Sequence, residues 1–457
     1  MIISIKTNAK TLLSVTKACL PDHLKVDETK SQIKSEGEIK ISWKIKTTET
    51  GEYIPAVSIA APKGAEITLS AGESVIRHKI QGTKGYFPNP EFNFERFELP
   101  GVLCLDESAG EIAVHIKSDP SAFIALPSID LYPKKLEHIL REEQALAANM
   151  RAEAAKVYDR CAQKGYGMMF HWTSQSCPLY GERKDYEQAV SDFDTEAFAE
   201  QAETAGASYV FLTANHAVRT FPAPLETWEE YFPGFTTKRD LIEDLYRSLE
   251  KRGIALMLYI NFTAAYMASP YYGSEQPNDM DLSTYDHYTK LCVDIFNEIG
   301  NRYGEKIKGF WIDSCYQPDQ QMEGYDFKPL YEAAKTGYAD RLVSFNFWIY
   351  PLTTPWNDYW GGETARYADI PDEKRPSFGP AKGRLYHQLI IMEYDWGHFS
   401  NEKPIQDPYY SAGEIAAFAK KAKETGVMLT INAEVYQDGT MGAKTLAVLK
   451  EAKALLE

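Results

Sequence analysis

The sequence lacks several patterns that would point to a particular class of protein. Its six cysteines form no CxxC or CxxxC pair, which argues against a zinc cage and a dithiol redox motif. HxH and HExxH spacings are also missing, so a metal-dependent hydrolase has little support. No run of about 18 apolar residues occurs, and the first residues lack the pattern of a signal peptide. We therefore expect a cytoplasmic protein without a metal or other cofactor, or a secreted or periplasmic one whose signal peptide has been removed.

Positive charge is also scarce. Lys and Arg number 49 against 65 Asp and Glu, a formal net charge of -16, which argues against a nucleic-acid partner. With 44% hydrophobic residues in 457, the chain can form two or three globular domains and is compatible with a homo-oligomer. Aromatic residues make up 13% of the chain, and seven of the eight tryptophans lie between Trp172 and Trp396. This favours a small-molecule partner bound in the C-terminal part.

Residues 1–133 are predicted to form an all-β sandwich domain. Short runs of alternating apolar and polar residues, among them "EIKISWKIKT", "AEITLSAGE" and "EIAVHIKSD", are separated by Gly, Pro and Asp. Residues 134–165 have the apolar spacing and composition of a connecting helix. The sandwich has no motif that assigns it a function, and we expect it to act as an accessory domain.

Residues 166–457 are predicted to form a (β/α)8-type TIM barrel, the catalytic domain. Apolar runs such as "YGMMFHW", "SYVFLTANH", "IALMLYINF" and "IKGFWIDS" alternate with amphipathic helical segments. A doubly wound sheet could alternate in the same way. The barrel is preferred because polar and aromatic residues end many different strands, which converge on one face of a barrel.

These strand-end residues are rich in carboxylate, imidazole and indole groups. Aromatic faces can stack on the C–H patch of a sugar ring while His, Asn and carboxylates bond its hydroxyls, so the set predicts sugar binding. Taken singly, each aromatic or histidine could also serve packing alone. The residues are His171, Trp172, Asn215, His216, Tyr259, Asn261, Trp311, Asp313, Asn346, Trp348, Glu393 and Trp396.

Asp313 stands out because it follows the apolar run "GFWI" directly. A carboxylate at a strand end, beside Trp311, is a candidate nucleophile of a retaining glycosidase, in which two carboxyl groups lie about 5 Å apart. The alternative is a carboxylate that caps the following helix, next to Ser314. Residue spacing alone leaves both readings open.

Five segments in order along the chain resemble the α-L-fucosidases of glycoside hydrolase family 29. They are "YGMMFHWTSQSCPLYGE", "FDTEAFAEQAETAGASYVFLTANH", "TTKRDLIEDLYRSLEKRGIALMLYINF", "IKGFWIDS" and "GVMLTINAEVYQDGTM". The fourth is similar to the family's nucleophile strand, which ends in Trp, one residue and Asp. A single match would be weak, whereas five ordered matches over residues 166–445 are hard to obtain by chance.

The resemblance implies a retaining mechanism with Asp313 as the nucleophile that forms a covalent glycosyl-enzyme. His171, His216, Tyr259 and Trp311 match sugar-contacting positions of the family, and Trp172 is expected beside them. Three departures from the family pattern affect the expected substrate. Ala217 replaces a second histidine, Thr173 replaces a glycine, and Arg219 adds a cation that could read an anionic or sulfated sugar if it faces the pocket.

The acid/base residue is expected on a loop after the nucleophile strand. "NDYWGGETARYADIP" resembles the corresponding family loop, which implies Glu363, although a surface glutamate is the alternative reading. Glu393 in "IIMEYDWGH" is the second candidate, and Glu373 in "PDEKRP" is the third. The group that serves must be protonated when the leaving group departs.

The sequence thus predicts a retaining exo-glycosidase that acts on α-L-fucosides or a related sugar, with an oligosaccharide or glycoside as partner and neither nucleic acid nor membrane. The alternative is a noncatalytic carbohydrate-binding protein built on a degenerate fucosidase-like barrel.

Overall fold

The computed structural model describes most of the chain. The described residues are 3–8, 14–15, 24–34, 38–47, 50–85, 93–106, 109–119, 124–216, 218–261, 285–315, 325–367 and 369–457. Ala217, at which the sequence departs from the family pattern, lies outside them.

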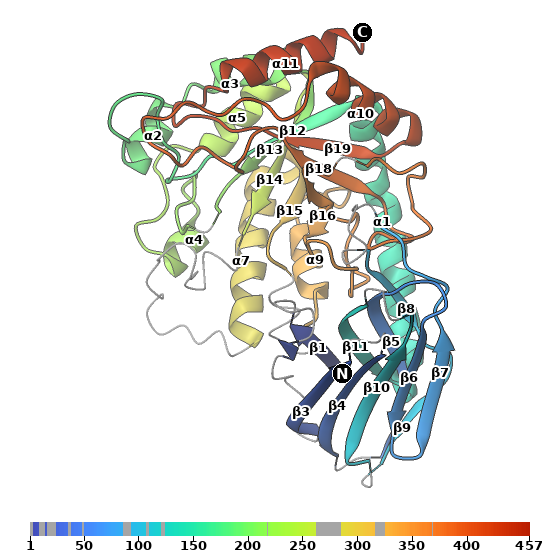
Figure 1. Ribbon diagram of the computed structural model, residues 1–457. Helices are drawn as coiled ribbons and strands as arrows, with labels where there is room; N and C mark the ends of the chain where they lie inside the picture. Colours follow the sequence, from blue (N-terminus) through green and yellow to red (C-terminus); the bar gives the residue numbers. More distant parts are fainter. Residues whose placement is uncertain are drawn as a thin grey trace.

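Two antiparallel sheets form an N-terminal β-sandwich, drawn in blue to teal in Figure 1. One sheet has the order β2-β1-β11-β5-β8, and β9 pairs with β5; the other has the order β3-β4-β10-β6-β7. The first contains β1 (Ile3–Asn8), β2 (Ser14–Val15), β5 (Gly51–Ala60), β8 (Glu95–Glu98), β9 (Leu103–Leu105) and β11 (Ala125–Pro133). The second contains β3 (Leu24–Lys34), β4 (Glu38–Thr47), β6 (Glu66–Ala71), β7 (Ser74–Lys79) and β10 (Glu111–Lys117).

The sandwich core follows from the period-two alternation of its strands. In β10, Ile112, Val114 and Ile116 are buried while the residues between them are more exposed. They share one apolar cluster with residues of the facing sheet, such as Val57 and Ile59 of β5. The predicted β-sandwich fold is therefore confirmed.

Helix α1 (Glu137–Gln163) follows the sandwich after the short 3-10 helix η2 (Lys134–Leu136). Its C-terminal half buries Ala154, Val157 and Tyr158 against the next domain. The Tyr158 hydroxyl donates to the carbonyl of Tyr386 and accepts from the backbone N–H of Met428 at 2.9 Å. Both partners lie where barrel strands begin, so α1 covers the amino ends of the strands and leaves the carboxyl ends for a site.

The C-terminal domain is a (β/α)8 barrel, which confirms the predicted fold class. Its eight parallel strands have the order β16-β15-β14-β13-β12-β19-β18-β17. The sheet closes on itself, because the backbone N–H of Asp358, shortly before β17, donates to the Val343 carbonyl of β16 at 2.9 Å. The strands are β12 (Tyr166–Phe170), β13 (Ala207–Thr213), β14 (Ala255–Ile260), β15 (Ile307–Ile312), β16 (Leu342–Phe345), β17 (Glu363–Ala365), β18 (His387–Ile391) and β19 (Met428–Asn432).

Helices surround these strands (Figure 1). They are α2 (Tyr186–Asp192), α3 (Thr195–Thr204), α4 (Glu226–Tyr231), α5 (Leu241–Glu250), α7 (Tyr285–Tyr303), α9 (Lys328–Ala334), α10 (Ala412–Thr425) and α11 (Ala443–Ala454). A one-turn 3-10 helix, η3 (Gly304–Lys306), leads into β15. Within the described part of the chain, no helix is both long enough and apolar enough to cross a membrane.

Strand alternation divides the barrel into an outer and an inner layer. In β14, Leu256, Leu258 and Ile260 face the surrounding helices, whereas Met257 and Tyr259 belong to the cluster inside the barrel. Because side chains alternate with a period of two, the residue two places after the last inner position of a strand also points inward, and it lies at the barrel mouth. Polar residues two places beyond an inner aromatic residue therefore gather there.

Candidate active site

Asp313 lies at the carboxyl end of β15, two residues after the inner Trp311. Its backbone N–H donates to the Ile260 carbonyl of the neighbouring strand at 2.8 Å, so the barrel sheet fixes its position. One carboxylate oxygen, Oδ2, accepts from the Tyr259 hydroxyl at 2.5 Å and from Asn261 Nδ2 at 3.1 Å. The other, Oδ1, accepts from Asn346 Nδ2 at 3.0 Å. The carboxylate is therefore held by side chains from β14 and β16, the two strands that flank β15.

Glu363 is linked to Asp313 through a single amide group. Asn346 Nδ2, which donates to Asp313, also donates to Glu363 Oε2 at 2.6 Å. An amide NH2 carries two N–H donors, so it can serve both carboxyl groups at once. The two bound oxygens can be no farther apart than the sum of these two distances. That bound fits the separation of about 5–5.5 Å in retaining glycosidases better than the 6.5–9.5 Å of inverting ones.

The environment of Glu363 favours its protonated form. Burial, and after it the negative charge of Asp313, raises the pKa of Glu363 to about 8. The Asn346 amide acts in the opposite direction, because its hydrogen bond lowers the pKa. Glu363 therefore carries a proton at neutral pH while lying beside an acceptor carboxylate, which is the pairing required for acid and nucleophile.

Two glycines place Glu363 at this position. Gly362 has a φ of 64°, and a Cβ built on it would lie 1.7 Å from the His387 carbonyl oxygen. Gly361 accepts a hydrogen bond from Trp311 Nε1 at 2.9 Å through its carbonyl. The sequence places Glu363 on a loop, but the structure places it at the first residue of β17, partly buried at the barrel mouth. The surface-loop reading of this glutamate is thus wrong.

The rings of His171 and His216 both lie next to the ring of Tyr259. The His171 ring centroid is 5.0 Å from that of His216 and 4.7 Å from that of Tyr259. Burial, and after it the proximity of His216, holds the pKa of His171 well below its usual value. Burial likewise lowers the pKa of His216, against the opposing effect of the Asp313 charge. Both rings are therefore neutral hydrogen-bonding groups at neutral pH.

Asn432 determines which nitrogen of His171 carries the proton. Asn432 Nδ2 donates to the Trp396 carbonyl at 2.8 Å, so its Oδ1 faces His171 Nδ1 at 2.7 Å and accepts from it. The proton of the neutral ring then resides on Nδ1, which leaves Nε2 as an acceptor for a hydroxyl group. The Trp396 ring lies 5.3 Å from the His171 ring, centroid to centroid.

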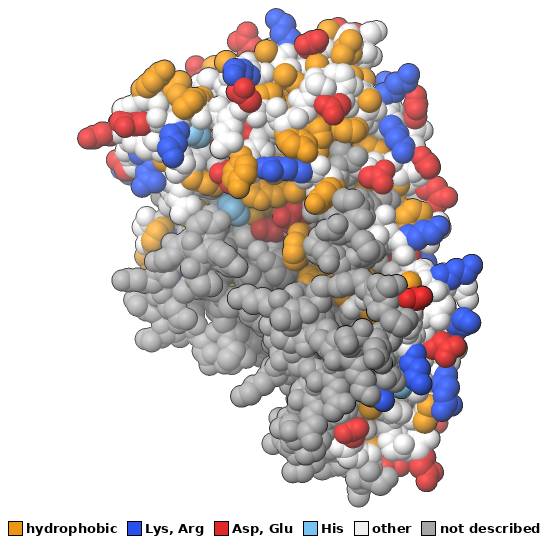
Figure 2. Space-filling view, in the orientation of Figure 1, with side chains coloured by type: hydrophobic (Ala, Val, Ile, Leu, Met, Phe, Trp, Pro, Cys, Tyr) orange, Lys and Arg blue, Asp and Glu red, His pale blue; other side chains and the backbone are white. Residues whose placement is uncertain are grey.

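Tyr259 and Trp311 form the floor of this group. Their rings stack with centroids 5.2 Å apart and an interplanar angle of 18°. Burial, and after it the charge of Asp313, keeps the pKa of Tyr259 well above its usual value, so the hydroxyl remains a donor. Figure 2 shows acidic, histidine and hydrophobic side chains together at this part of the surface, above the strands labelled β14 to β16 in Figure 1.

The structure does not bring the Trp172 side chain to this group. Trp172 follows the outward-facing Phe170 of β12 by two residues, and it packs in the outer layer against Tyr186 and Phe193. Its Nε1 donates to the Gln437 carbonyl at 2.9 Å. The guanidinium of Arg219 lies 6.0 Å from the centre of the Phe235 ring. The expectation that Trp172 contacts the sugar fails because strand alternation directs it away from the barrel interior.

The structure also separates Glu393 and Glu373 from Asp313. Strand β18 ends at Ile391, and the Glu393 carboxyl then accepts from the Thr445 hydroxyl of α11 and from the backbone N–H of Glu434 at 3.0 Å. Burial raises the pKa of Glu393 to about 8, but this group faces α11 and not the paired carboxyls. Glu373 is exposed. Both are therefore set aside as acid/base candidates.

The sequence predicted sugar binding for Asn261 and Asn346 as strand-end residues, but it did not predict their bonds to Asp313 and Glu363, and it did not indicate Asn432. Asn261 and Asn346 were recognisable as strand-end residues, and Asn432 occupies the last position of β19. The signal that could have identified them is their spacing from inner positions of β14, β16 and β19. Ser314 and Trp348 have positive φ angles of 60° and 53° next to this site, a conformation that costs a non-glycine residue free energy.

The described residues contain no group of three or more His, Cys, Asp or Glu side chains placed to hold a metal ion. The arrangement offers one carboxylate, one protonated carboxyl and several neutral donors and acceptors, a set suited to proton transfer and nucleophilic attack.

A family model described as alpha-L-fucosidase matches residues 136–457. None of the curated proteins matches the chain.

Several solved structures resemble the chain at low sequence identity. Alpha-L-fucosidase isoenzyme 1 from Paenibacillus thiaminolyticus is 17% identical with a TM-score of 0.50, over 66% of this chain and 75% of that one. A GH29 alpha-L-fucosidase from Bacteroides thetaiotaomicron, solved as a trapped covalent intermediate, is 15% identical with a TM-score of 0.49, over 65% and 73% of the two chains. An alpha-L-fucosidase from Lactobacillus casei in complex with alpha-L-fucose is 16% identical with a TM-score of 0.46, over 66% and 98%.

Proposed function

Because the chain belongs to the alpha-L-fucosidase family and is therefore a glycoside hydrolase, we propose that it is a retaining exo-glycosidase that acts on α-L-fucosides or a closely related sugar. Asp313 is the nucleophile and Glu363 the acid/base residue in this proposal. The observation that carries it is the single amide of Asn346, which bonds both carboxyl groups and so keeps them close together.

In the first step, Asp313 Oδ1 or Oδ2 attacks the anomeric carbon of the bound sugar. The bond between that carbon and the leaving-group oxygen breaks, and Glu363 transfers its proton to this oxygen. The product of the step is an ester between the sugar and Asp313. The raised pKa of Glu363, about 8, supports this role, because an acid must carry its proton at the pH of the reaction.

In the second step, a water molecule replaces the departed group. Esterified Asp313 no longer carries a charge, so one of the causes that raise the Glu363 pKa is removed. Glu363, now ionised, takes a proton from the water, whose oxygen attacks the anomeric carbon and releases Asp313 as a carboxylate. The sugar leaves with the configuration that it had in the substrate.

Several groups around the pair are placed to hold the sugar. His171 Nε2 is an acceptor for a hydroxyl, and His216 lies next to it. The Tyr259 hydroxyl bonds the nucleophile and can orient it for attack. We propose His171, His216 and Tyr259 as the residues that face the sugar, with Trp311 supporting Tyr259 from behind. The partner is thus an oligosaccharide or another glycoside.

The test is a comparison of aryl glycosides, whose leaving groups need little acid assistance. Wild type, Asp313→Asn and the exposed control Asp372→Asn would be assayed with an α-L-fucoside, a β-D-galactoside, an α-L-galactoside, an α-L-rhamnoside and a uronide. We expect release from the α-L-fucoside by wild type and by the control, and none above background by Asp313→Asn. Release from another glycoside alone would replace the sugar and keep the mechanism. Activity that persists in Asp313→Asn would contradict the proposal. A wild type that hydrolyses none of the substrates would also contradict it and would favour a binding protein.

A further inference from the structure

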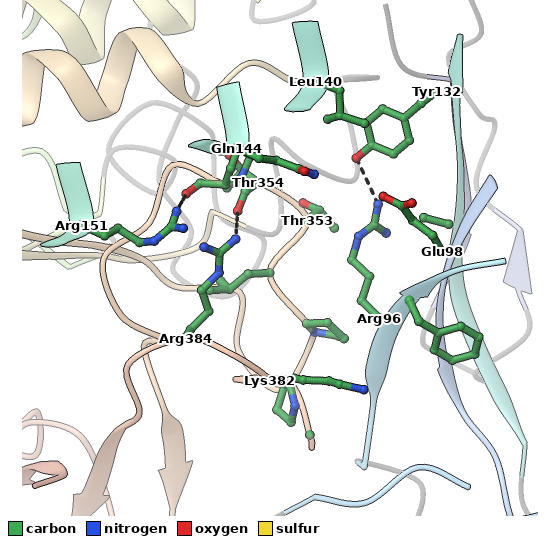
Figure 3. A pocket seen from close by; sticks show the side chains of 17 residues that line it. Arg96, Glu98, Tyr132, Leu140, Gln144, Arg151, Thr353, Thr354, Lys382 and Arg384 are labelled. Carbon is green, nitrogen blue, oxygen red and sulfur yellow. Dashed lines mark hydrogen bonds between the residues drawn. The ribbon is translucent and has the colours of Figure 1, made fainter. Parts of the chain in front are cut away.

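A cavity of ≈ 380 Å³ lies between the N-terminal sandwich and the barrel, away from the paired carboxyls. Figure 3 shows it from close by. Its walls come from strand β8, from helix α1, from the segment 351–355 that follows β16, and from the segment 379–384 that precedes β18. Its volume is within the range of about 300–1,000 Å³ typical of small-molecule sites.

Four of the five charged side chains that line the cavity are cations. Three of the five lining charges are already paired. Glu98 receives two hydrogen bonds from Arg141, at 2.7 and 2.8 Å, and Arg96 forms an ion pair with Asp130. The remaining pair joins Lys382 Nζ to a carboxylate of β8 at 3.3 Å. Two arginines, Arg151 and Arg384, are left.

Among the residues that the structure describes, Arg151 and Arg384 donate to backbone carbonyls only. Arg151 donates to the Pro355 carbonyl, and Arg384 donates to the Thr354 carbonyl at 3.5 Å. In the part of the chain that the structure describes, neither guanidinium has an ion pair or a hydrogen bond with a carboxylate. Figure 3 shows both side chains turned toward the same loop, close to each other. Burial, and after it the charge of Arg151, lowers the pKa of Arg384 to about 10.

Asp358 is the acidic group whose negative charge raises the pKa of both arginines, against the larger effect of burial. It is already engaged, because Asp358 Oδ2 accepts from Lys335 Nζ at 2.6 Å and Oδ1 accepts from the Tyr331 hydroxyl at 2.5 Å. This leaves an excess of positive charge in a partly buried cavity. Such charge is costly without a counter-charge, and a guanidinium binds oxyanions through two parallel hydrogen bonds.

We propose that this cavity is a binding site for a small organic anion, whose phosphate, sulfate or carboxylate group lies between Arg151 and Arg384. The volume exceeds what one oxyanion needs, so the rest of the molecule occupies the space toward Gln144 and Tyr132. This site is separate from the proposed catalytic pair and does not depend on the proposed function. The segment 351–355 that forms one wall follows β16 and Asn346, so the two sites share one connection of the chain.

Inorganic phosphate, sulfate and citrate serve as probes, each compared with sodium chloride at constant ionic strength. Binding would be followed by isothermal titration calorimetry and by the melting temperature of the full chain. The variants are Arg384→Gln, Arg384→Lys and Arg151→Gln, and Arg247→Gln is the matched control, since Arg247 lies on an exposed face of α5 and bonds Glu243 at 3.1 Å.

We expect saturable binding of at least one probe to wild type and to Arg247→Gln, and affinity reduced by roughly tenfold or more in Arg384→Gln and Arg151→Gln. Arg384→Lys keeps the charge and should retain part of the affinity. Without probe, Arg384→Gln should melt no lower than wild type, because it removes an uncompensated cation. Equal responses of Arg384→Gln and Arg247→Gln, or no response beyond that to chloride, would overturn the proposal. If Arg384→Gln does not fold, Arg151→Gln and Arg384→Lys decide the question by the same comparison.

Discussion

Replacement of Glu363 by glutamine should remove the acid without changing the size of the side chain. Glutamine can still accept the hydrogen bond of Asn346, which is 2.6 Å long in the wild type, so the site should keep its geometry. It cannot give a proton to the leaving group. A positioned general acid contributes about 10²–10⁴-fold, and we expect kcat/KM for a substrate with a poor leaving group to fall by this factor. An activated aryl fucoside should lose much less in its first step.

The same variant has a defined effect on the pH profile. In the wild type, the pKa of about 8 keeps Glu363 protonated at neutral pH, so kcat/KM for the poor leaving group should decline about tenfold per pH unit above that value. Glu363→Gln has no proton to lose there, and its alkaline limb should vanish. The exposed Glu373→Gln serves as the control and should keep the wild-type profile. An alkaline limb that survives in Glu363→Gln, or an equal loss on both substrates, would refute the assignment.

Three further substitutions test the surroundings of the pair and one buried acid. Tyr259→Phe removes a hydrogen bond of 2.5 Å to Asp313, and a bond to a charged acceptor is worth about 1.5–3 kcal/mol. We therefore expect kcat/KM to fall roughly 10- to 100-fold while the melting temperature stays nearly unchanged. An unaltered kcat/KM would argue against a role for this hydroxyl. Asn346→Ala removes a bond that lowers the Glu363 pKa, so the alkaline limb of kcat/KM should move to higher pH as the rate drops, and a limb that stays in place would contradict the shared amide. Glu393→Gln tests the raised pKa of Glu393. The Glu393 carboxyl keeps its proton up to about pH 8 in the folded wild type but only up to about pH 4.5 in the unfolded chain. The free energy of unfolding of the wild type should therefore decrease as the pH rises from about 4.5 to about 8. Urea unfolding over that range should show a decline smaller by a few kcal/mol in Glu393→Gln, and parallel curves would exclude the group as its cause.

The barrel and the place of Asp313 at the end of a strand could be predicted because their signals are local. Continuous apolar runs and the helical spacing between them identify the strands before and after β15 without any knowledge of their partners. Asp313 follows the inner Trp311 by two residues, so the pattern itself directs both into the barrel. The sandwich was predicted from its longer strands, such as β4 and β10.

Other features depend on contacts between distant segments and could not be predicted. Strand β8 has four residues, and β9 and β17 have three each, so each is defined by its partner rather than by its own pattern. Trp172 was expected at the site because it follows His171, but neighbours in a strand face opposite sides. Glu393 lies beyond the end of β18, where the alternation no longer applies, and only the contact with Thr445 shows its direction.

The central claim is that Asp313 forms the covalent intermediate. The most direct test is to trap that intermediate with 2-fluoro-fucosyl fluoride, in which fluorine slows the release of the sugar more than its attachment, and to identify the labelled peptide by mass spectrometry. We predict one sugar per chain, attached to Asp313, and none on Asp313→Asn. A label on any other residue, or no label on a wild-type enzyme that turns over an aryl α-L-fucoside, would contradict the account.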